Sequence, residues 1–289
     1  MQNFGLIIIL LSSVCATCFA RTADSVKLIL DQYGTALLCD HDTPCRKGLY
    51  CVHNCYYPGV MECSRTETHK SCDRHDHGKP AAPKRNMVTL LTEGKMKFLG
   101  ETSFNFTCSI SLVQTKQGKI ILVDTGPIPQ KIRLIRQLNK RGIDVTDVDF
   151  VVTTHGHPDH YSNVNLFVDS LHNFDQFYIN GHNFEMNGIT ADNPLFIFGD
   201  KTVKLIQTPG HTPQDTSLIV RKVNRYRSVG IVGDLILNED SVKDTSGISE
   251  EQVKSMKKVI CQVKWIIPGH GPPFKTKKHR ANFGCAASK

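Results

Sequence analysis

Several apolar runs along this 289-residue chain end in a histidine or an aspartate that stands beside a glycine or a threonine. Their content of Val and Ile predicts β-strands, and we expect strands within 119–126, 148–155, 203–211, 217–222, 228–234 and 264–271. The metal-capable residues at the strand ends are Asp124, His155, His211, Asp234 and His270. Because α/β sheets place their sites at the carboxyl ends of strands, we expect these side chains to meet at one edge.

Amphipathic patterns between these runs predict helices. Apolar residues recur at helical spacing over 132–138, 164–171 and 253–260. Ser249 and Gln252 precede the last of these segments with the spacing of a capping box. Strands that alternate with helices in this way predict an α/β fold.

The densest group of candidate ligands lies in the stretch TTHGHPDHYSN, Thr153 to Asn163. His155 and His157 are two residues apart on an extended segment, so both side chains can project to one side and hold one metal ion. Asp159 and His160 follow at the turn into the next segment and can point to a second ion nearby. The complete motif, with further histidines in TPGHT and PGHG and an aspartate in VGDL, indicates a metal centre far more strongly than a lone H-x-H pair.

The stretches that carry chemistry are similar to those of the metallo-β-lactamase superfamily. They are ILVDTG, TTHGHPDHYSN, QTPGHT, VGDL and IIPGHGPPF, and the resemblance extends over about residues 87–289. It implies an αββα sandwich, in which two β-sheets pack face to face with helices outside. The residues before this region have no part in the resemblance.

The resemblance also implies a ligand set, position by position. It assigns one zinc ion to His155, His157 and His211 and a second to Asp159, His160 and His270, with Asp234 as the bridge between the ions. Asp124 matches the family's aspartate that orients a ligand histidine by accepting its far N–H. Members that hydrolyse β-lactams often carry cysteine at the position of Asp234, so the resemblance argues against lactamase activity as the native role.

Such a centre implies hydrolysis by a metal-bridging hydroxide. Two metal ions can hold a water between them and lower its pKa from about 15.7 towards 7. One ion would then polarise the substrate oxygen, while Asp159 would act as the catalytic residue that assists proton transfer. Nitrogen and oxygen ligands without thiolate suit Zn²⁺, and Mn²⁺ or iron fit nearly as well.

The bond that is cleaved stays open, because members of the superfamily hydrolyse thioesters, lactones, amides and phosphodiesters, including those of RNA. The net charge of +8 favours an anionic small molecule or RNA as substrate. The basic stretch FKTKKHR, Phe274 to Arg280, has few aromatic residues for base stacking, and we interpret it as a solvated terminal face.

The N-terminal third has a different character. Residues 4–20 form a short apolar run that ends in small residues, which predicts a signal peptide over 1–20 and a secreted protein. A membrane anchor is the alternative, but the run is short for a bilayer, and no later stretch is apolar enough to span a membrane. Six cysteines between residues 39 and 72 predict a disulfide-rich module at 21–74, with zinc ligation as the alternative. A polar stretch with proline and glycine predicts a linker at 75–86, ahead of the domain at 87–289.

Several further points remain open from the sequence. Asn105, in NFT, is a candidate glycosylation site. Cys108, Cys261 and Cys285 are an odd number, so one of them is free or pairs outside the larger domain. The alternative function is that of a secreted binding protein, in which the cysteine-rich module recognises a protein or surface partner and the larger domain is scaffold. The complete ligand set weighs against that alternative. The oligomeric state is not predicted.

Overall fold

The computed structural model describes residues 50–53, 61–64, 79–100, 103–190 and 192–286. The chain divides between Gly78 and Lys79 into two units, and each is described by itself. In the first unit, β1 (Tyr50–His53) and β2 (Met61–Ser64) form a two-stranded antiparallel sheet. The predicted signal peptide, most of the predicted cysteine-rich module and residues 75–78 of the predicted linker lie outside the described residues. Over the described part of the chain, no helix is both long and apolar enough to cross a bilayer.

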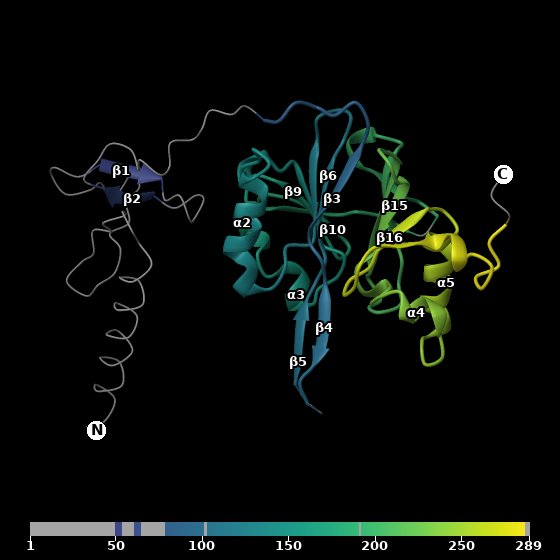
Figure 1. Cartoon of the computed structure of the whole chain (residues 1–289). Helices are drawn as coiled ribbons and strands as arrows, with labels where there is room; N and C mark the ends of the chain where they lie inside the picture. Colours follow the sequence, from purple (N-terminus) through teal and green to yellow (C-terminus); the bar gives the residue numbers. More distant parts are fainter. Residues whose placement is uncertain (1–49, 54–60, 65–78, 101–102, 191, 287–289) are drawn as a thin grey trace, which may run out of the picture. The chain divides into compact units, whose positions relative to one another are not determined.

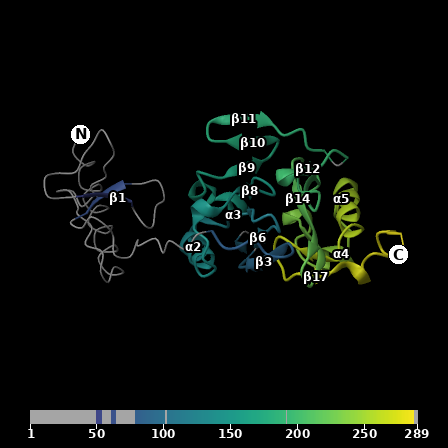
Figure 2. The same cartoon turned by 90° about the horizontal axis from the view of Figure 1, so that it is seen from above.

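The second unit is an αββα sandwich of two mixed sheets, as predicted (Figures 1 and 2). The first sheet has the strand order β11-β10-β9-β8-β7-β6-β3 and the second the order β12-β13-β14-β15-β16-β17. The strands of the first sheet are β3 (Met87–Thr92), β6 (Ile110–Gln114), β7 (Ile120–Val123), β8 (Phe150–Val152), β9 (Leu171–Phe174), β10 (Phe177–Asn180) and β11 (Asn183–Met186). Those of the second are β12 (Leu195–Phe196), β13 (Val203–Gln207), β14 (Thr216–Val223), β15 (Arg227–Ile231), β16 (Trp265–Ile267) and β17 (Phe274–Lys275). A separate hairpin, β4 (Lys95–Phe98) with β5 (Phe104–Thr107), extends beyond the sandwich (Figure 1).

Alternate residues of the central strands pack into different layers of the sandwich. In β7, Ile121 and Val123 lie in the core between the two sheets. Ile120 and Leu122 point the other way, into the core beneath α2 (Lys131–Asn139). This two-residue period is that of a pleated strand. A strand that is buried on both faces must be apolar throughout, which is why the run at 120–123 shows no polar alternation.

The second sheet is covered by α5 (Glu250–Ile260) and the short α4 (Asp240–Lys243) (Figure 1). The Ser249 side chain caps α5 by accepting a hydrogen bond of 3.2 Å from the backbone N–H of Gln252. The Gln252 side chain does not complete the predicted capping box. Its amide instead donates to the backbone oxygen of Leu235 at 3.0 Å and so ties the helix to the loop after β15.

The helix predicted over 164–171 is wrong. The structure has a short 3₁₀ turn at Val164–Leu166, and the chain then enters β9 at Leu171. The Ser170 hydroxyl donates to the backbone oxygen of Val148 at 2.6 Å, and the Leu171 N–H donates to the oxygen of Asp149 at 3.1 Å. These bonds draw the segment alongside β8, and strand pairing overrides the local helical spacing of its apolar residues.

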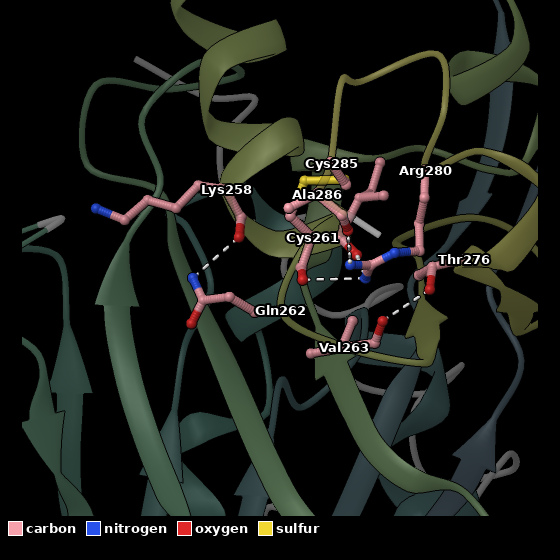
Figure 3. The surroundings of a disulfide bond; sticks show 9 residues. Lys258, Cys261, Gln262, Val263, Thr276, Arg280, Cys285 and Ala286 are labelled. Atoms are coloured by element: carbon pink, nitrogen blue, oxygen red, sulfur yellow. Dashed lines mark hydrogen bonds between the residues drawn. A yellow bond between two sulfur atoms is a disulfide. The ribbon is translucent and has the colours of Figure 1, made fainter. Parts of the chain in front are cut away.

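The C-terminal segment is tied to the end of α5 by a disulfide (Figure 3). Cys261 and Cys285 form this bond, with their Cα atoms 5.3 Å apart. Arg280 adds hydrogen bonds to the backbone oxygens of Ile260 and Cys261 at 3.2 and 3.0 Å. Cys108 is free and buried, so it is the unpaired member of the three cysteines in this unit.

Removing buried atoms from α2 should destabilise the sandwich. Leu138 is fully buried in the core between α2 and the first sheet, whereas Ile132 on the same helix is 42% exposed. We expect Leu138→Ala to lower the free energy of unfolding by about 2–5 kcal/mol because it leaves a cavity. Ile132→Ala is the matched control and should change it by less than about 1 kcal/mol. Urea unfolding measures both, and equal effects would contradict this packing.

The half-buried carboxylate of Asp149, just before β8, should make the stability of the protein depend on pH. Asp149 accepts hydrogen bonds from Lys79 at 2.6 Å, Lys119 at 3.0 Å and the Ile120 N–H at 2.8 Å. Burial raises the pKa of Asp149, but these bonds outweigh burial, and its pKa is lowered overall. Because the pKa of Asp149 is lower in the folded than in the unfolded protein, its ionisation stabilises the fold at pH values above the unfolded-state pKa of about 3.9. This stability is lost as the pH falls through the folded-state pKa.

We therefore expect Asp149→Asn to be less stable than the wild type at neutral pH, with a difference that shrinks below about pH 4. Urea unfolding at a series of pH values measures this difference. Asp169→Asn, the same change at an exposed position, should leave the pH dependence unaltered. A difference between the wild type and Asp149→Asn that stays constant down to acid pH would contradict the assignment.

Candidate metal centre

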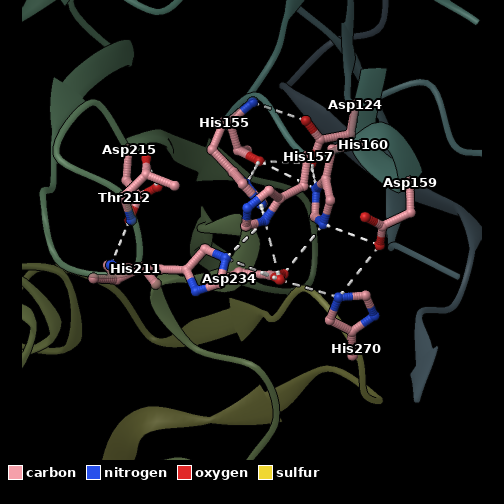
Figure 4. A network of polar contacts seen from close by, with 12 residues as sticks. Asp124, His155, His157, Asp159, His160, His211, Thr212, Asp215, Asp234 and His270 are labelled. Atoms are coloured by element: carbon pink, nitrogen blue, oxygen red, sulfur yellow. Dashed lines mark hydrogen bonds and ion pairs between the residues drawn. The ribbon is translucent and has the colours of Figure 1, made fainter. Parts of the chain in front are cut away.

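The predicted ligands come from the carboxyl ends of strands in both sheets. β7 runs parallel to β8, and β15 runs parallel to β16, so these strands end at one edge of the sandwich. Asp124 follows β7, His155 follows β8, His211 lies in the loop after β13, Asp234 follows β15 and His270 follows β16. His157, Asp159 and His160 lie at or within the four-residue α3 (Pro158–Tyr161). Figure 4 shows that these side chains point toward one another.

The first group of side chains is His155, His157, His211 and Asp234. The Nδ1 atom of His157 lies 2.9 Å from Nε2 of His155 and 3.0 Å from Nε2 of His211. Asp234 Oδ2 lies 3.9 and 3.6 Å from the same two Nε2 atoms. In a tetrahedral zinc site with bonds of about 2.0–2.1 Å, ligand atoms are about 3.3 Å apart. The observed spacing therefore suits one metal ion.

The second group is Asp159, His160 and His270. Asp159 Oδ2 lies 3.5 Å from the Nε2 atoms of both His160 and His270. The Asp234 carboxylate reaches this group as well, because its Oδ1 is 3.2 Å from Nε2 of His160 and its Oδ2 is 3.1 Å from Nε2 of His270. Asp234 thus lies between the two groups and contacts both.

Three buried atoms at the centre lack a hydrogen-bond partner. They are Asp159 Oδ2, His160 Nε2 and Asp234 Oδ1. Buried polar atoms in native proteins are normally paired, and unpaired ones that face a common point are available to hold an ion. The donor set of imidazole nitrogens and carboxylate oxygens also suits a divalent metal. The residues present therefore fit metal ions.

The centre is closed on one side and open on the other. His155, His160, Asp234 and His270 are buried. His157 is exposed, and the side chains of His211 and Asp159 keep 27% and 16% of their surface accessible. A small molecule can therefore approach along His157, His211 and Asp159, while the far wall is fixed in the protein.

Neighbouring groups fix which nitrogen of each buried histidine faces the centre. His160 Nδ1 lies 2.8 Å from Asp124 Oδ2, and His270 Nδ1 lies 3.1 Å from the backbone oxygen of Thr107. Each Nδ1–H can donate to its oxygen, which leaves Nε2 for a metal ion. Asp124 therefore occupies the orienting position that the resemblance implies for it.

The protein environment shifts the pKa values of the buried ligands in different directions. Burial lowers the pKa of His155 to about 2, so this ring is neutral and able to bind a metal. Burial also lowers the pKa of His160, but Asp124 and Asp234 outweigh burial and raise it to about 10. Burial raises the pKa of Asp234, while the nearby rings of His160 and His270 lower it well below its usual range. A histidine ligand binds a metal through a deprotonated nitrogen, so a metal ion at His160 would compete with protons for Nε2.

Asp124 is held in an unusual backbone conformation. Its φ is +59°, a left-handed value that aspartate tolerates better than most residues. Its carboxylate also accepts hydrogen bonds from the backbone N–H of Thr154 at 2.8 Å and from the Thr154 hydroxyl at 2.9 Å. Asp124 thus ties the end of β7 to the end of β8 as well as to His160.

Two residues at the centre were not found from the sequence. Asp215 accepts hydrogen bonds from the backbone N–H groups of His211 and Thr212, both at 2.8 Å, and so holds the loop that carries His211. An acidic residue four positions after His211 in a proline- and glycine-rich loop was the available signal. Cys108 lies with Asp124 and His160 in a third group of close ligand atoms, and nothing in its local sequence indicated this.

Asn105 was predicted as a glycosylation site and is not one of the metal ligands. It is an exposed residue of β5, and glycosylation at this position stays a prediction.

The sequence of the chain matches a known protein family. The model of the metallo-beta-lactamase superfamily matches residues 104–270. The chain is 34% identical over 206 residues to Metallo-beta-lactamase domain-containing protein 1 of Xenopus laevis, which covers 69% of this chain and 85% of that protein. It is 31% identical over 188 residues to an uncharacterized protein of Caenorhabditis elegans, with 62% of this chain and 51% of that protein covered. The chain thus spans about half of the Caenorhabditis relative.

A solved structure shares the fold. The chain is similar to the crystal structure of a Thermotoga maritima protein, with a TM-score of 0.52 and 19% identity. The similarity covers 66% of this chain and 99% of that one. At this level of identity the match concerns the fold alone.

Loss of the Asp124 charge should weaken metal binding without unfolding the protein. We expect Asp124→Asn to lower the affinity for Zn²⁺ about 10- to 100-fold, because His160 loses the carboxylate that orients it. Asparagine tolerates the left-handed backbone, so the fold should persist. Competition with a coloured chelator measures the affinity. Asp175→Asn, at another aspartate with positive φ of 55°, is the matched control, and an equal loss there would contradict the role of Asp124.

Proposed function

Because the chain belongs to the metallo-β-lactamase superfamily and is a metal-dependent hydrolase, we propose that it binds two zinc ions and cleaves an ester-type bond. The bond is a phosphodiester, as in an endoribonuclease, or a thioester or lactone. One observation carries the proposal: the Asp234 carboxylate lies within 3.9 Å of ligand nitrogens of both groups. A carboxylate in this position can bridge two ions.

The two ions, when bound, supply an activated water as nucleophile and stabilise the negative charge that develops on the substrate oxygen. His155, His157 and His211 would hold one ion, and Asp159, His160 and His270 the other. Mn²⁺ or iron would fit the same nitrogen and oxygen donors. The buried position of His155 and His160 keeps water away from the inner wall, which strengthens the electrostatic interactions there.

Asp159 is the residue best placed to move a proton. Its side chain lies at the open side of the centre, and its Oδ2 is 3.5 Å from Nε2 of His160 and of His270. A carboxylate here can exchange a proton with a substrate or with solvent while it stays next to both histidines. This supports a catalytic role for Asp159 in addition to a ligand role.

The substrate is proposed to be anionic. The net charge of +8 raises the local concentration of anions around the protein. Asp234 stands where enzymes that hydrolyse β-lactams often have cysteine, which favours another substrate class.

We further propose that the protein is secreted. The apolar run at residues 4–20 and the six cysteines between 39 and 72 support this proposal. A cysteine-rich module in the secretory pathway would be stapled by disulfides and could bind a protein or surface partner, next to the hydrolase domain.

The proposed function is tested by metal content and turnover of the full-length protein. We expect two zinc ions per chain by elemental analysis, and hydrolysis of at least one member of a panel of thioester, lactone, phosphodiester and RNA substrates. Asp234→Asn should lose metal and activity together. Asp159→Asn should keep the metal of the first group and lower kcat by at least about 100-fold, because proton transfer is lost.

Chelation should abolish turnover, and added Zn²⁺ or Mn²⁺ should restore it. Asp169→Asn, at an exposed site away from the ligands, should match the wild type. One ion or none in the wild-type protein would refute the binuclear centre. Full activity after confirmed removal of metal would refute metal-dependent hydrolysis, and metal content without turnover on the whole panel would favour the scaffold alternative.

A further inference from the structure

The basic stretch at 274–280 is a folded part of the second sheet. Phe274, Thr276 and His279 are buried, with exposed fractions of 5%, 0% and 3%. Lys275, Lys277 and Lys278 are exposed. The stretch forms β17 and the following 3₁₀ turn (Thr276–Lys278). The three lysines are exposed, as expected for a solvated face, and the buried residues between and beside them anchor the stretch in the fold.

The anchors of this segment are specific (Figure 3). The Thr276 hydroxyl donates to the backbone oxygen of Val263 at 2.7 Å. Arg280 binds the end of α5, and the disulfide between Cys261 and Cys285 closes the segment behind it. Ordering these lysines therefore costs little further backbone entropy when a ligand binds.

Strand register brings more cations to the same place. Trp265 is paired with Lys275 on one side and with Val229 on the other. The Lys264 N–H donates to the backbone oxygen of Ser228. This bond holds Lys264 close to the backbone of Arg227, the residue before Ser228. We call this surface the basic face, and define it by the exposed residues Arg225, Arg227, Lys264, Lys275, Lys277 and Lys278 around Trp265 and Tyr226.

Aromatic rings are interleaved with these charges. Trp265 and Tyr226 are in edge contact with ring centroids 5.2 Å apart, and Tyr226 is 38% exposed. The ammonium of Lys275 lies 5.4 Å from the Trp265 ring centre. Trp265, Pro273 and Phe274 also line a hollow of about 610 Å³ together with Lys275, Lys277 and Lys278. This volume is large enough for a nucleobase with its sugar and phosphate.

Acidic residues hardly offset this charge. The segments 216–233 and 263–280, which supply every residue of the basic face, contain no Asp or Glu. Glu239 is the acidic residue that lines the hollow, and it is already bound to Lys278 at 2.8 Å and to His279 at 2.9 Å. Among the described residues, the other five cations of the basic face form no ion pair. Their field is therefore available to an external anion.

The basic face lies at the opposite end of the strands from the metal centre. Asp234 and His270 follow the carboxyl ends of β15 and β16, whereas Arg227 and Trp265 begin these strands. At about 3.3 Å per residue, the five residues of β15 separate the two places by about 15 Å or more. The basic face is therefore a site of its own.

We propose that the basic face binds single-stranded nucleic acid. Cations contact the phosphates, and a base stacks against Trp265 in the hollow that this ring lines. The combination of a positive groove with aromatic rings is the one that single strands require, whereas a polysaccharide or an anionic membrane surface needs the charges alone. The site goes beyond the proposed hydrolysis, because binding there needs neither metal nor turnover.

The chain supplies its own probe for this proposal, since Trp265 is its single tryptophan. Oligouridylate titrated into the full-length protein should quench the intrinsic fluorescence as a base stacks on Trp265. Fluorescence anisotropy with labelled oligouridylate should give the same midpoint. The double variant Lys275→Gln/Lys277→Gln should weaken binding about tenfold and reduce the slope of log affinity against log salt by about one.

The matched control removes the same charge elsewhere. Arg133→Gln/Arg136→Gln alters two exposed arginines of α2, on the other sheet, and should weaken binding less than twofold. Protein freed of metal by chelation should bind oligouridylate with the same midpoint, because the basic face needs no metal, and this separates the result from the fate of the proposed hydrolysis. Melting temperatures check that each variant is folded.

Three results would overturn the proposal. The first is binding without any change in Trp265 fluorescence, and the second is an equal loss of affinity in the α2 control. The third is that heparin, or vesicles rich in anionic lipid, bind as tightly and quench as strongly as oligouridylate, since neither carries bases.

Discussion

The metal edge of the sandwich depends on burying carboxylates next to histidines. Asp124 and Asp234 are 1% and 5% exposed, which would be costly for isolated charges. His160 lies 2.8 Å from one and 3.2 Å from the other, so this one ring compensates both. The compensation is incomplete, because His160 Nε2 and Asp234 Oδ1 lie 3.2 Å apart but neither atom has a hydrogen-bond partner. Metal binding would complete it, and part of its free energy would then appear as folding stability.

The sheet topology converts this local requirement into a global one. Parallel pairs β7–β8 and β15–β16 end at the same edge, and each pair belongs to a different sheet. A shift between the sheets would separate Asp234 from His160 and leave both buried without a partner. The apolar core between the sheets, with Ile121 and Val123 facing Leu218 and Val220, therefore does more than hide surface from water. It fixes the distance between the two halves of the centre.

The features predicted from sequence are those that depend on local pattern. Apolar runs bounded by Gly or Thr identified the central strands, and the H-x-H-x-D-H motif identified side chains that the structure brings together. The helix expected at 164–171 failed because hydrogen bonds from Ser170 and Leu171 to the neighbouring strand decide that segment, and spacing within one segment carries no information about them. Asp215 and Cys108 were missed for a related reason, since their roles depend on a loop conformation and on the packing of distant segments.

Contacts between distant segments also explain why the function inferred for the stretch at 274–280 differs between sequence and structure. Read alone, Phe274 to Arg280 has one aromatic residue and five basic ones, if His279 is counted with them. The parallel pairing of β15 with β16, and the antiparallel pairing of β16 with β17, add the aromatic rings and further cations from segments far away in sequence. The strands β15 and β16 thus connect the two sites: their carboxyl ends lead to Asp234 and His270 at the metal edge, and they begin at Arg227 and Trp265 on the basic face. Because the strands are short and buried along their middle, neither end can shift its register without displacing the other.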